Sequence, residues 1–216
     1  MQIFSPGALI ALKVGTLGLT ITLVAAILAW RTAIAIRPAV GAPVEQVVPF
    51  SHKHHAGDDG IDCRYCHSTV ETSEFAGIPP LSTCMTCHSQ LFSDAPILAR
   101  LRQAYTGEAR LAWSRVHDLP DFVYFDHSIH IAKGVGCSTC HGRVDTMPLT
   151  HRVASLKMEW CLGCHREPER YLRPANEVFN MDWQPSADQL ERGRQLRQQY
   201  HLHTTDVLTA CSTCHR

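Results

Sequence analysis

The stretch Cys63-Arg-Tyr-Cys66-His67 is the first of five short motifs in which two cysteines stand three residues apart and a histidine follows the second. The other four motifs are Cys84–His88, Cys137–His141, Cys161–His165 and Cys211–His215. Together they use all 10 cysteines of the 216-residue chain. One pattern repeated five times at constant spacing indicates five copies of one kind of site.

Cysteines at this spacing share one turn of a helix, so both sulfurs can reach the two vinyl groups of one porphyrin, and the adjacent histidine can bind its iron. Cys-x-x-Cys-His is the attachment motif of c-type haem. We therefore predict five covalently bound haem c groups. The attaching cysteines are Cys63, Cys66, Cys84, Cys87, Cys137, Cys140, Cys161, Cys164, Cys211 and Cys214. The histidines predicted to bind iron beside them are His67, His88, His141, His165 and His215.

Structural zinc and disulfide bonds are the alternatives for paired cysteines. Zinc ribbons combine two cysteine pairs per metal, which does not suit five pairs, and zinc does not require a histidine directly after each pair. Disulfide bonds would leave the five histidines unexplained. Haem attachment accounts for both features.

Nine further histidines are available to bind the opposite face of each iron, and four of them belong to an internal repeat. Phe50–His55 and Phe125–His130 both read Phe-x-His-x-x-His and precede Cys63 and Cys137 by a few residues. Positions i and i+3 share one face of a helical turn, so each segment can serve the haem of its own unit and a neighbouring haem. His54 points away from that pair, toward solvent. The predicted distal ligands are His52, His55, His127 and His130.

Other residues are candidates for the remaining distal positions. His117 lies in a turn-like stretch before Pro120, and Met158 lies three residues before Cys161. A thioether ligand would raise the potential of its haem, although Met158 could instead pack next to Trp160. The distal ligands of the fourth and fifth haems stay open among Met158, His151, His201 and His203. Irons with both axial positions filled transfer electrons and bind no substrate.

The N-terminal region contains a run of 17 uncharged residues, Val14 to Trp30. As a helix this run is about 26 Å long, close to the roughly 30 Å hydrocarbon core of a bilayer. We predict a membrane anchor over residues 1–36 with a single transmembrane helix at about 9–30. A cleaved signal peptide ending at Ala33–Ala35 is the alternative, but Arg31 interrupts the approach to that site, so we expect the segment to be retained.

Residues 37–49 contain three prolines and are predicted to form a tether, and residues 50–216 carry all five motifs. This leaves about 33 residues per motif, too few to build an independent core. We therefore predict a mainly α-helical and coil domain whose core is built by haem, in addition to the transmembrane helix.

Two helices are expected away from the attachment motifs. The first has apolar residues at helical spacing after Pro96 and should end near Gly107. The second should begin at a capping box formed by Ser186 and Gln189 and continue to about Tyr200.

The charge composition also limits the choice of partners. The chain has 20 basic and 20 acidic side chains, which argues against binding nucleic acid because phosphate binding needs excess positive charge. Covalent haem attachment takes place on the outer side of the bacterial cytoplasmic membrane. We therefore expect the haem domain in the periplasm and the N-terminus in the cytoplasm.

Three segments are similar to a known family: Phe50–His55, Trp113–His130 and Leu156–Cys161. They resemble the membrane-anchored pentahaem cytochrome c subunit of alternative complex III, a bacterial quinol-oxidising complex unrelated to cytochrome bc1. The resemblance covers essentially the whole chain, with one span, a short tether and five motifs.

The resemblance implies an electron-transfer subunit that is no enzyme by itself. Its partners would be an iron–sulfur subunit related to molybdopterin oxidoreductases, polytopic quinol-binding subunits and a monohaem cytochrome c. Electrons from menaquinol would pass to a soluble periplasmic cytochrome c or copper protein. The alternative is a stand-alone multihaem quinol dehydrogenase that feeds a periplasmic reductase, but those carry four haems.

Overall fold

The computed structural model describes residues 5–35 and 39–215 and divides the chain into two compact units, Met1–Ala39 and Val40–Arg216. Both units are helical. Within the described residues the only pairing of extended segments is an isolated antiparallel bridge between Val135 and Leu172. The chain is therefore mainly helix and coil, as the sequence predicts.

The first unit consists of one helix, α1 (Pro6–Ala35), which is longer at both ends than the predicted 9–30. Its segment Pro6–Thr32 is long and apolar enough to cross a membrane. The hydroxyls of its threonines donate hydrogen bonds to backbone carbonyls three or four residues earlier, which satisfies these polar groups within the helix. The predicted end of the anchor, at residue 36, lies outside the described residues.

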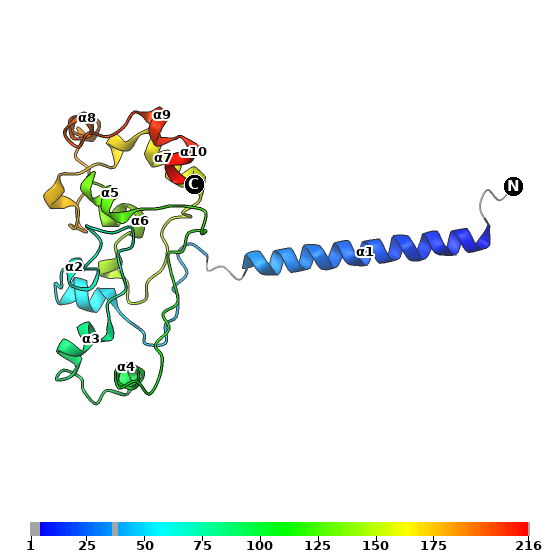
Figure 1. The fold of residues 1–216 in the computed structure, drawn as a ribbon, viewed down its shortest axis with the longest axis horizontal. Helices are drawn as coiled ribbons and strands as arrows, with labels where there is room; N and C mark the ends of the chain where they lie inside the picture. The colour runs from blue at the N-terminus through cyan, green and yellow to red at the C-terminus, as the bar shows by residue number, and fades with distance from the viewer. Residues whose placement is uncertain (1–4, 36–38, 216) are drawn as a thin grey trace. The chain divides into compact units, whose positions relative to one another are not determined.

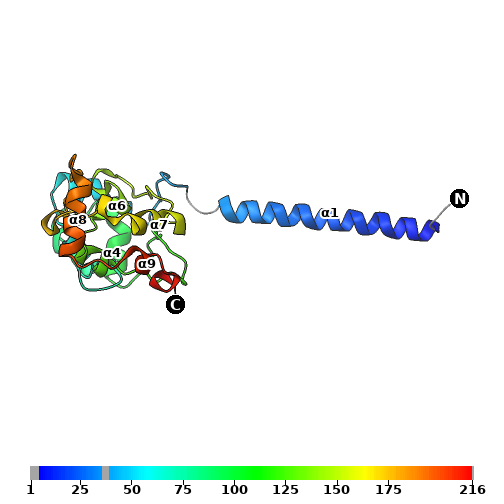
Figure 2. The same ribbon diagram turned by 90° about the horizontal axis from the view of Figure 1, so that it is seen from above.

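The second unit contains short helices joined by long irregular segments (Figure 1). In chain order they are η1 (Lys53–Asp58, a π-helical turn), α2 (Cys63–Cys66), α3 (Leu81–His88), η2 (Pro96–Leu98), α4 (Ala99–Tyr105), α5 (His127–Ala132), α6 (Cys137–His141), η3 (Val144–Thr146), α7 (Met158–Arg166), η4 (Pro168–Arg170), η5 (Ala175–Glu177), α8 (Gln189–Gln199), α9 (Thr205–Leu208) and α10 (Cys211–Cys214). In Figure 1, α3 and α4 lie at one end of this unit, α8, α9 and α10 at the other, and α5 and α6 between them. Figure 2 shows the same unit from above.

The cysteines of every attachment motif lie on a helix, namely α2, α3, α6, α7 and α10. The carboxylate of Asp62, at the N-cap of α2, accepts a hydrogen bond of 2.8 Å from the backbone N–H of Arg64.

Residues 40–49, predicted as part of a tether, belong to the second unit. The backbone N–H groups of Gly41 and Val44 donate to the carbonyls of Arg152 and Thr150 at 2.7 and 3.1 Å. Val48 is buried. The sequence prediction was wrong for this stretch, since these bonds join it to residues 150–152; residues 37 and 38 of the tether lie outside the described part.

The apolar core of the second unit is small. The buried hydrophobic residues among those described are Val48, Val70, Leu101, Ala104, Met147, Ala154, Leu172 and Val178. Large aromatic side chains are left open, with Phe75, Phe92 and Phe122 each more than 60% exposed. A polypeptide of this size usually buries far more apolar surface, so a further apolar component is needed to complete the core.

The helix expected after Pro96 is present as η2 followed by α4, and Gly107 follows it with a φ of +83° that ends the helix. Its apolar face is inside, with Leu101 and Ala104 buried. Leu101 is 4% exposed, so this short helix contributes directly to the small core.

The predicted capping box at α8 is wrong, although the helix itself is present. α8 begins at Gln189 after Asp188, and no side chain caps its N-terminus. Instead, the Gln189 amide donates to the backbone carbonyls of Glu169 and Leu172 at 2.9 and 2.8 Å. The Gln189 side chain, which would have completed the capping box, therefore bonds to residues 169–172 instead.

The contact between α8 and η4 depends on a glycine. Gly193 is buried, and a methyl group there would collide with the backbone carbonyl of Glu169. Further along α8, Arg197 forms an ion pair with the Glu169 side chain, and both side chains are mostly shielded from solvent. Backbone and side-chain contacts therefore hold α8 on the same short segment.

We expect Gly193→Ala to separate α8 from η4 and to lower stability by about 1–3 kcal/mol, the usual cost of overpacking. Thermal unfolding of the purified protein should show a midpoint lower by roughly 3–10 °C. Gln198→Ala, an exposed change in the same helix, is the matched control and should leave the midpoint unchanged. Equal midpoints for Gly193→Ala and the control would contradict this account.

Candidate haem centres

Four histidines of the attachment motifs each face a second histidine. The ring centroids of His52 and His67 are 6.4 Å apart, and those of His127 and His141 are 6.3 Å apart, with both pairs nearly parallel. His55 and His88, and likewise His130 and His165, are separated by 6.1 Å. The four predicted distal histidines thus each lie opposite a different attachment-site histidine.

This separation is the one expected when a single metal ion lies between two imidazoles. A metal–nitrogen bond is about 2.0 Å long, as in zinc–imidazole sites, and the nitrogen is roughly 1.1 Å from the ring centroid, so two opposed rings should have centroids about 6.2 Å apart. Directly stacked aromatic rings can come considerably closer. Each pair therefore leaves room for one iron.

The hydrogen bonds of these rings leave the other ring nitrogen free for a metal. Nδ1 of His67, His88 and His165 lies 2.8 to 3.1 Å from the backbone carbonyls of Gly77, Leu91 and Leu208. The corresponding carbonyl partners of His55, His127, His130 and His215 belong to Ser51, Glu74, Asp126 and Phe122. Because a carbonyl only accepts, Nδ1 carries the proton in these seven rings, and Nε2 keeps its lone pair for iron.

The two Phe-x-His-x-x-His segments have the same local geometry. The Phe50 ring is perpendicular to His52 at 4.9 Å and stacked on His55 at 4.5 Å. The Phe125 ring is likewise perpendicular to His127 at 4.7 Å and stacked on His130 at 4.5 Å. The phenylalanine therefore fixes the orientation of both histidines, although one segment forms a π-helical turn and the other an α-helix.

Burial keeps several of these imidazoles neutral. Burial, together with repulsion from nearby imidazoles, lowers the pKa of His52 to about 4 and that of His141 to about 3. Burial also lowers the pKa of His130. Only the neutral ring can donate a lone pair to a metal, so these sites are prepared for coordination at neutral pH.

The cysteines of neighbouring motifs also lie close together. Burial raises the pKa of Cys66, with Cys84 of the second motif adding to the effect, and it raises the pKa of Cys137 to about 11, with Cys63 contributing. Burial and the nearby Cys164 thiol together raise the pKa of Cys140 to about 12. Burial and the Cys214 thiol raise the pKa of Cys161. In space the motifs therefore follow the order second, first, third, fourth, fifth.

The fifth motif differs from the others. The ring of His215 lies 5.7 Å from Phe122, and no second imidazole of the described residues faces it. Met158, the first residue of α7, is 68% exposed. His201 and His203 follow α8 and are exposed. The structure thus brings no histidine to the distal side of the fifth motif.

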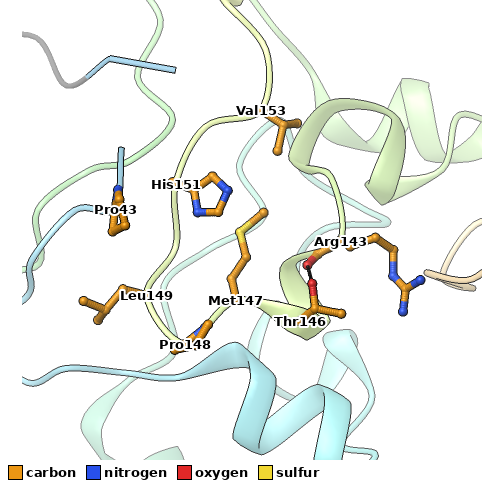
Figure 3. A pocket seen from close by; sticks show the side chains of 8 residues that line it. All are labelled: Pro43, Arg143, Thr146, Met147, Pro148, Leu149, His151 and Val153. Atoms are coloured by element: carbon orange, nitrogen blue, oxygen red, sulfur yellow. Dashed lines mark hydrogen bonds between the residues drawn. The ribbon is translucent and has the colours of Figure 1, made fainter. Parts of the chain in front are cut away.

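His117 and His151, two further candidates, lie elsewhere. The ring of His117 is only 4.2 Å from that of His141, which is too short for an iron between them, so His117 lies beside His141 rather than opposite it. His151 lines a cavity of about 500 Å³ together with Met147 and Val153 (Figure 3). Nε2 of His117 and Nδ1 of His151 are buried without a hydrogen-bond partner.

These observations fit a c-type haem at each motif better than zinc. None of the 10 cysteines forms a disulfide bond. In the described part of the chain no three His, Cys, Asp or Glu side chains come together as a metal site, whereas structural zinc takes four ligands. Opposed imidazoles, exposed aromatic rings and orphaned buried nitrogens all fit a large, flat, largely apolar group with a central metal.

Comparison with known proteins agrees with this geometry. The chain is 30% identical over 181 residues, which are 80% of its length, to the multihaem cytochrome c subunit of menaquinone reductase from Nitratidesulfovibrio vulgaris, and the match covers 77% of that protein. The chain belongs to this family of multihaem cytochromes c. Residues 129–216 of the cytochrome also match the Cytochrome c3 family. Covalently bound haem and electron transfer follow from this membership.

Some residues that support the sites have no local signal in the sequence of the cytochrome. Thr150 hydrogen-bonds His52 at 2.9 Å across 98 residues, and Glu74 accepts from His127 through its backbone carbonyl. A backbone acceptor is indifferent to its side chain, and Thr150 is an ordinary residue in an irregular segment. Only the folded chain identifies these positions.

The adjacent residues His54 and His55 allow a direct test of the pairing. His54 lies at the surface beside Asp59, whereas His55 faces His88. We expect His55→Ala to convert one haem from low spin to high spin and to allow it to bind carbon monoxide, as seen in optical and EPR spectra. His54→Ala should leave both spectra unchanged. A fully low-spin His55→Ala protein would rule out the pairing with His88.

Proposed function

We propose that this cytochrome is the electron-relay subunit of a membrane-bound quinone oxidoreductase and carries five haem c groups. The opposed histidine pairs carry the proposal, because each pair would hold one haem iron from both sides and leave no open position on that iron for a substrate. Haem held in this way supplies one-electron transfer between ferric and ferrous iron. The polypeptide holds the groups in place and does not catalyse a reaction by itself.

The fifth haem would be held by Cys211, Cys214 and His215. Met158 is the proposed distal ligand, because α7 contacts α9, which directly precedes the fifth motif, and because Cys161 lies near Cys214. A thioether there would give this haem a higher potential than the four with two imidazoles. Four haems would thus have two histidine ligands, and the fifth would have one histidine and one methionine ligand.

The spatial order of the motifs supports a relay. The second and fifth motifs are at the ends of the series, and α3 and α10, which carry them, lie in the two opposite parts of the unit in Figure 1. The first, third and fourth motifs lie between them. A partner that gives electrons and a partner that takes them can therefore bind at separate ends.

Quinone chemistry would take place in another subunit. The polar side chains within the apolar stretch of α1 are threonines, and their hydroxyls are already bonded to the backbone of the helix. This helix therefore offers no acceptor for the protons of a quinol. Polytopic quinone-binding subunits and an iron–sulfur subunit are the proposed partners, and α1 is the anchor that keeps the haem domain on the periplasmic side.

Two candidate functions differ in the direction of electron flow between quinone and haem. The similarity of Trp113–His130 to the pentahaem subunit of alternative complex III supports quinol oxidation, with a periplasmic cytochrome c or copper protein as acceptor, and we propose this direction. The relative from Nitratidesulfovibrio vulgaris belongs by its name to a menaquinone reductase, which favours the reverse direction as the second candidate.

Purification from detergent-solubilised membranes tests the proposal. We expect iron–sulfur and polytopic subunits to co-purify with the cytochrome, and its intact mass to exceed that of the polypeptide by five haems. Added menaquinol should reduce the haems of the complex rapidly, because the partners supply the quinol site and proton acceptors. The isolated cytochrome should stay oxidised under the same conditions.

Three results would change this conclusion. Rapid reduction of the isolated cytochrome by menaquinol would favour a stand-alone quinol dehydrogenase. Oxidation of pre-reduced complex by menaquinone, without reduction by menaquinol, would favour the menaquinone-reducing direction. A mass without added haem would overturn the proposed function as a whole.

A further inference from the structure

Arg173 is a buried cation at the third attachment motif. It is 2% exposed, and its Nη2 donates hydrogen bonds to the hydroxyls of Ser138 and Thr139, both at 3.1 Å. Ser138 and Thr139 are the two residues between Cys137 and Cys140. The guanidinium therefore lies directly on the part of α6 between the two cysteines of the third motif.

The remaining contacts of this guanidinium are also neutral. Nη1 donates to the backbone carbonyls of Asn180 and Glu177 at 3.1 and 3.4 Å, and Cζ lies 4.4 Å from the centre of the Trp183 ring. No carboxylate in the described residues forms an ion pair with Arg173. The Glu177 carboxylate is within electrostatic reach, but it accepts hydrogen bonds from Asn176 and Asn180 instead.

Other arginines of the unit provide a contrast. Arg143, two residues after His141, pairs with Asp145 and Asp182 and is 40% exposed. Arg197 pairs with Glu169. Opposite charges and water screen these cations, whereas the charge of Arg173 is neither paired nor solvated.

The surrounding backbone is built around this side chain. A methyl group at Gly136 would collide with the guanidinium, so glycine leaves the space that it occupies. The backbone N–H of Arg173 donates to the carbonyl of Gly134 at 2.9 Å, and that of Cys137 donates to Val178 at 3.2 Å. The cation is therefore held at a fixed place beside α6.

A purely structural role does not account for the charge. A neutral amide could donate to the same hydroxyls, and burying an unpaired cation costs far more free energy than burying an amide. Arg173 keeps a positive charge at a position where burying that charge is unfavourable in free energy. It therefore has an effect that a neutral donor would not have.

We propose that Arg173 raises the reduction potential of the haem attached at the third motif. This inference rests on the proposed function. Reduction removes one positive charge from a haem iron, so a fixed, unscreened cation nearby favours the ferrous form. Haem attached at Cys137 and Cys140 would have its vinyl edge at this motif, and its acidic propionates on the opposite edge would then lie farther from the cation.

Redox titration of the haem-loaded cytochrome tests the proposal. His127→Ala serves as a marker background, because it opens the third haem and gives it a high-spin spectrum that can be followed alone. Adding Arg173→Gln should lower the midpoint potential of this high-spin haem. The midpoint potentials of the low-spin haems should change much less. Arg173→Lys should leave the midpoint potential of this haem close to its value with arginine, because the substitution keeps the positive charge and changes only the hydrogen bonds.

Arg143→Gln is the matched control, because it removes a paired, exposed cation near the same motif. Its effect on the marked haem should be much smaller than that of Arg173→Gln. Equal shifts in Arg143→Gln and Arg173→Gln, or equal shifts in Arg173→Lys and Arg173→Gln, would overturn the proposal in favour of a purely structural role.

A second variant covers the case in which Arg173→Gln does not fold. Glu177→Gln removes a nearby negative charge without touching the guanidinium, so the potential of the marked haem should rise. An unchanged or lower potential would contradict the proposal. Intact mass measured on the unsubstituted cytochrome and on each variant separates the two levels of failure: haems missing from the unsubstituted cytochrome would refute the proposed function, whereas unshifted potentials in variants that carry five haems would refute only the role of Arg173.

Discussion

The arrangement of this cytochrome depends on pairs of imidazoles held about 6 Å apart by the backbone. The pairs join different segments of the chain: η1 and α2 lie between His52 and His67, and α6 and η3 lie between His130 and His165. An iron bonded to both rings and a porphyrin bonded to two cysteines would close each of these loops covalently. Such cross-links stabilise a chain whose apolar core is small, because they restrict its unfolded state and supply the missing apolar surface.

The second constraint is electrostatic. Burial lowers the pKa of three of the histidines that face one another, His52, His130 and His141, and Arg143 near them is paired with Asp145 and Asp182. Arg173 breaks this pattern by carrying an unpaired charge beside the third motif, in the middle of the spatial series. A relay needs sites of graded affinity for electrons, and the chain has two means of grading them, the type of axial ligand and the charge nearby.

The sequence predicts what is local and misses what is made by distant segments. The attachment helices and the placing of two histidines on one turn follow from spacings of three residues, which the Phe-x-His-x-x-His repeat records. The capping box at Ser186 failed because Gln189 bonds to residues 169–172, a contact with no sequence signal. Thr150 and Arg173 were missed for the same reason. Residues 40–49 were predicted to be a tether because their prolines are typical of an extended linker, and the backbone hydrogen bonds to residues 150–152 have no sequence signal.

The central claim is that opposed histidines bind iron from both sides, and near-infrared magnetic circular dichroism tests it most directly. The charge-transfer band of oxidised haem reports the identity of both axial ligands. The account predicts a band typical of two imidazoles that accounts for four of five irons in the oxidised cytochrome. A spectrum dominated by histidine–methionine or high-spin haem would contradict it.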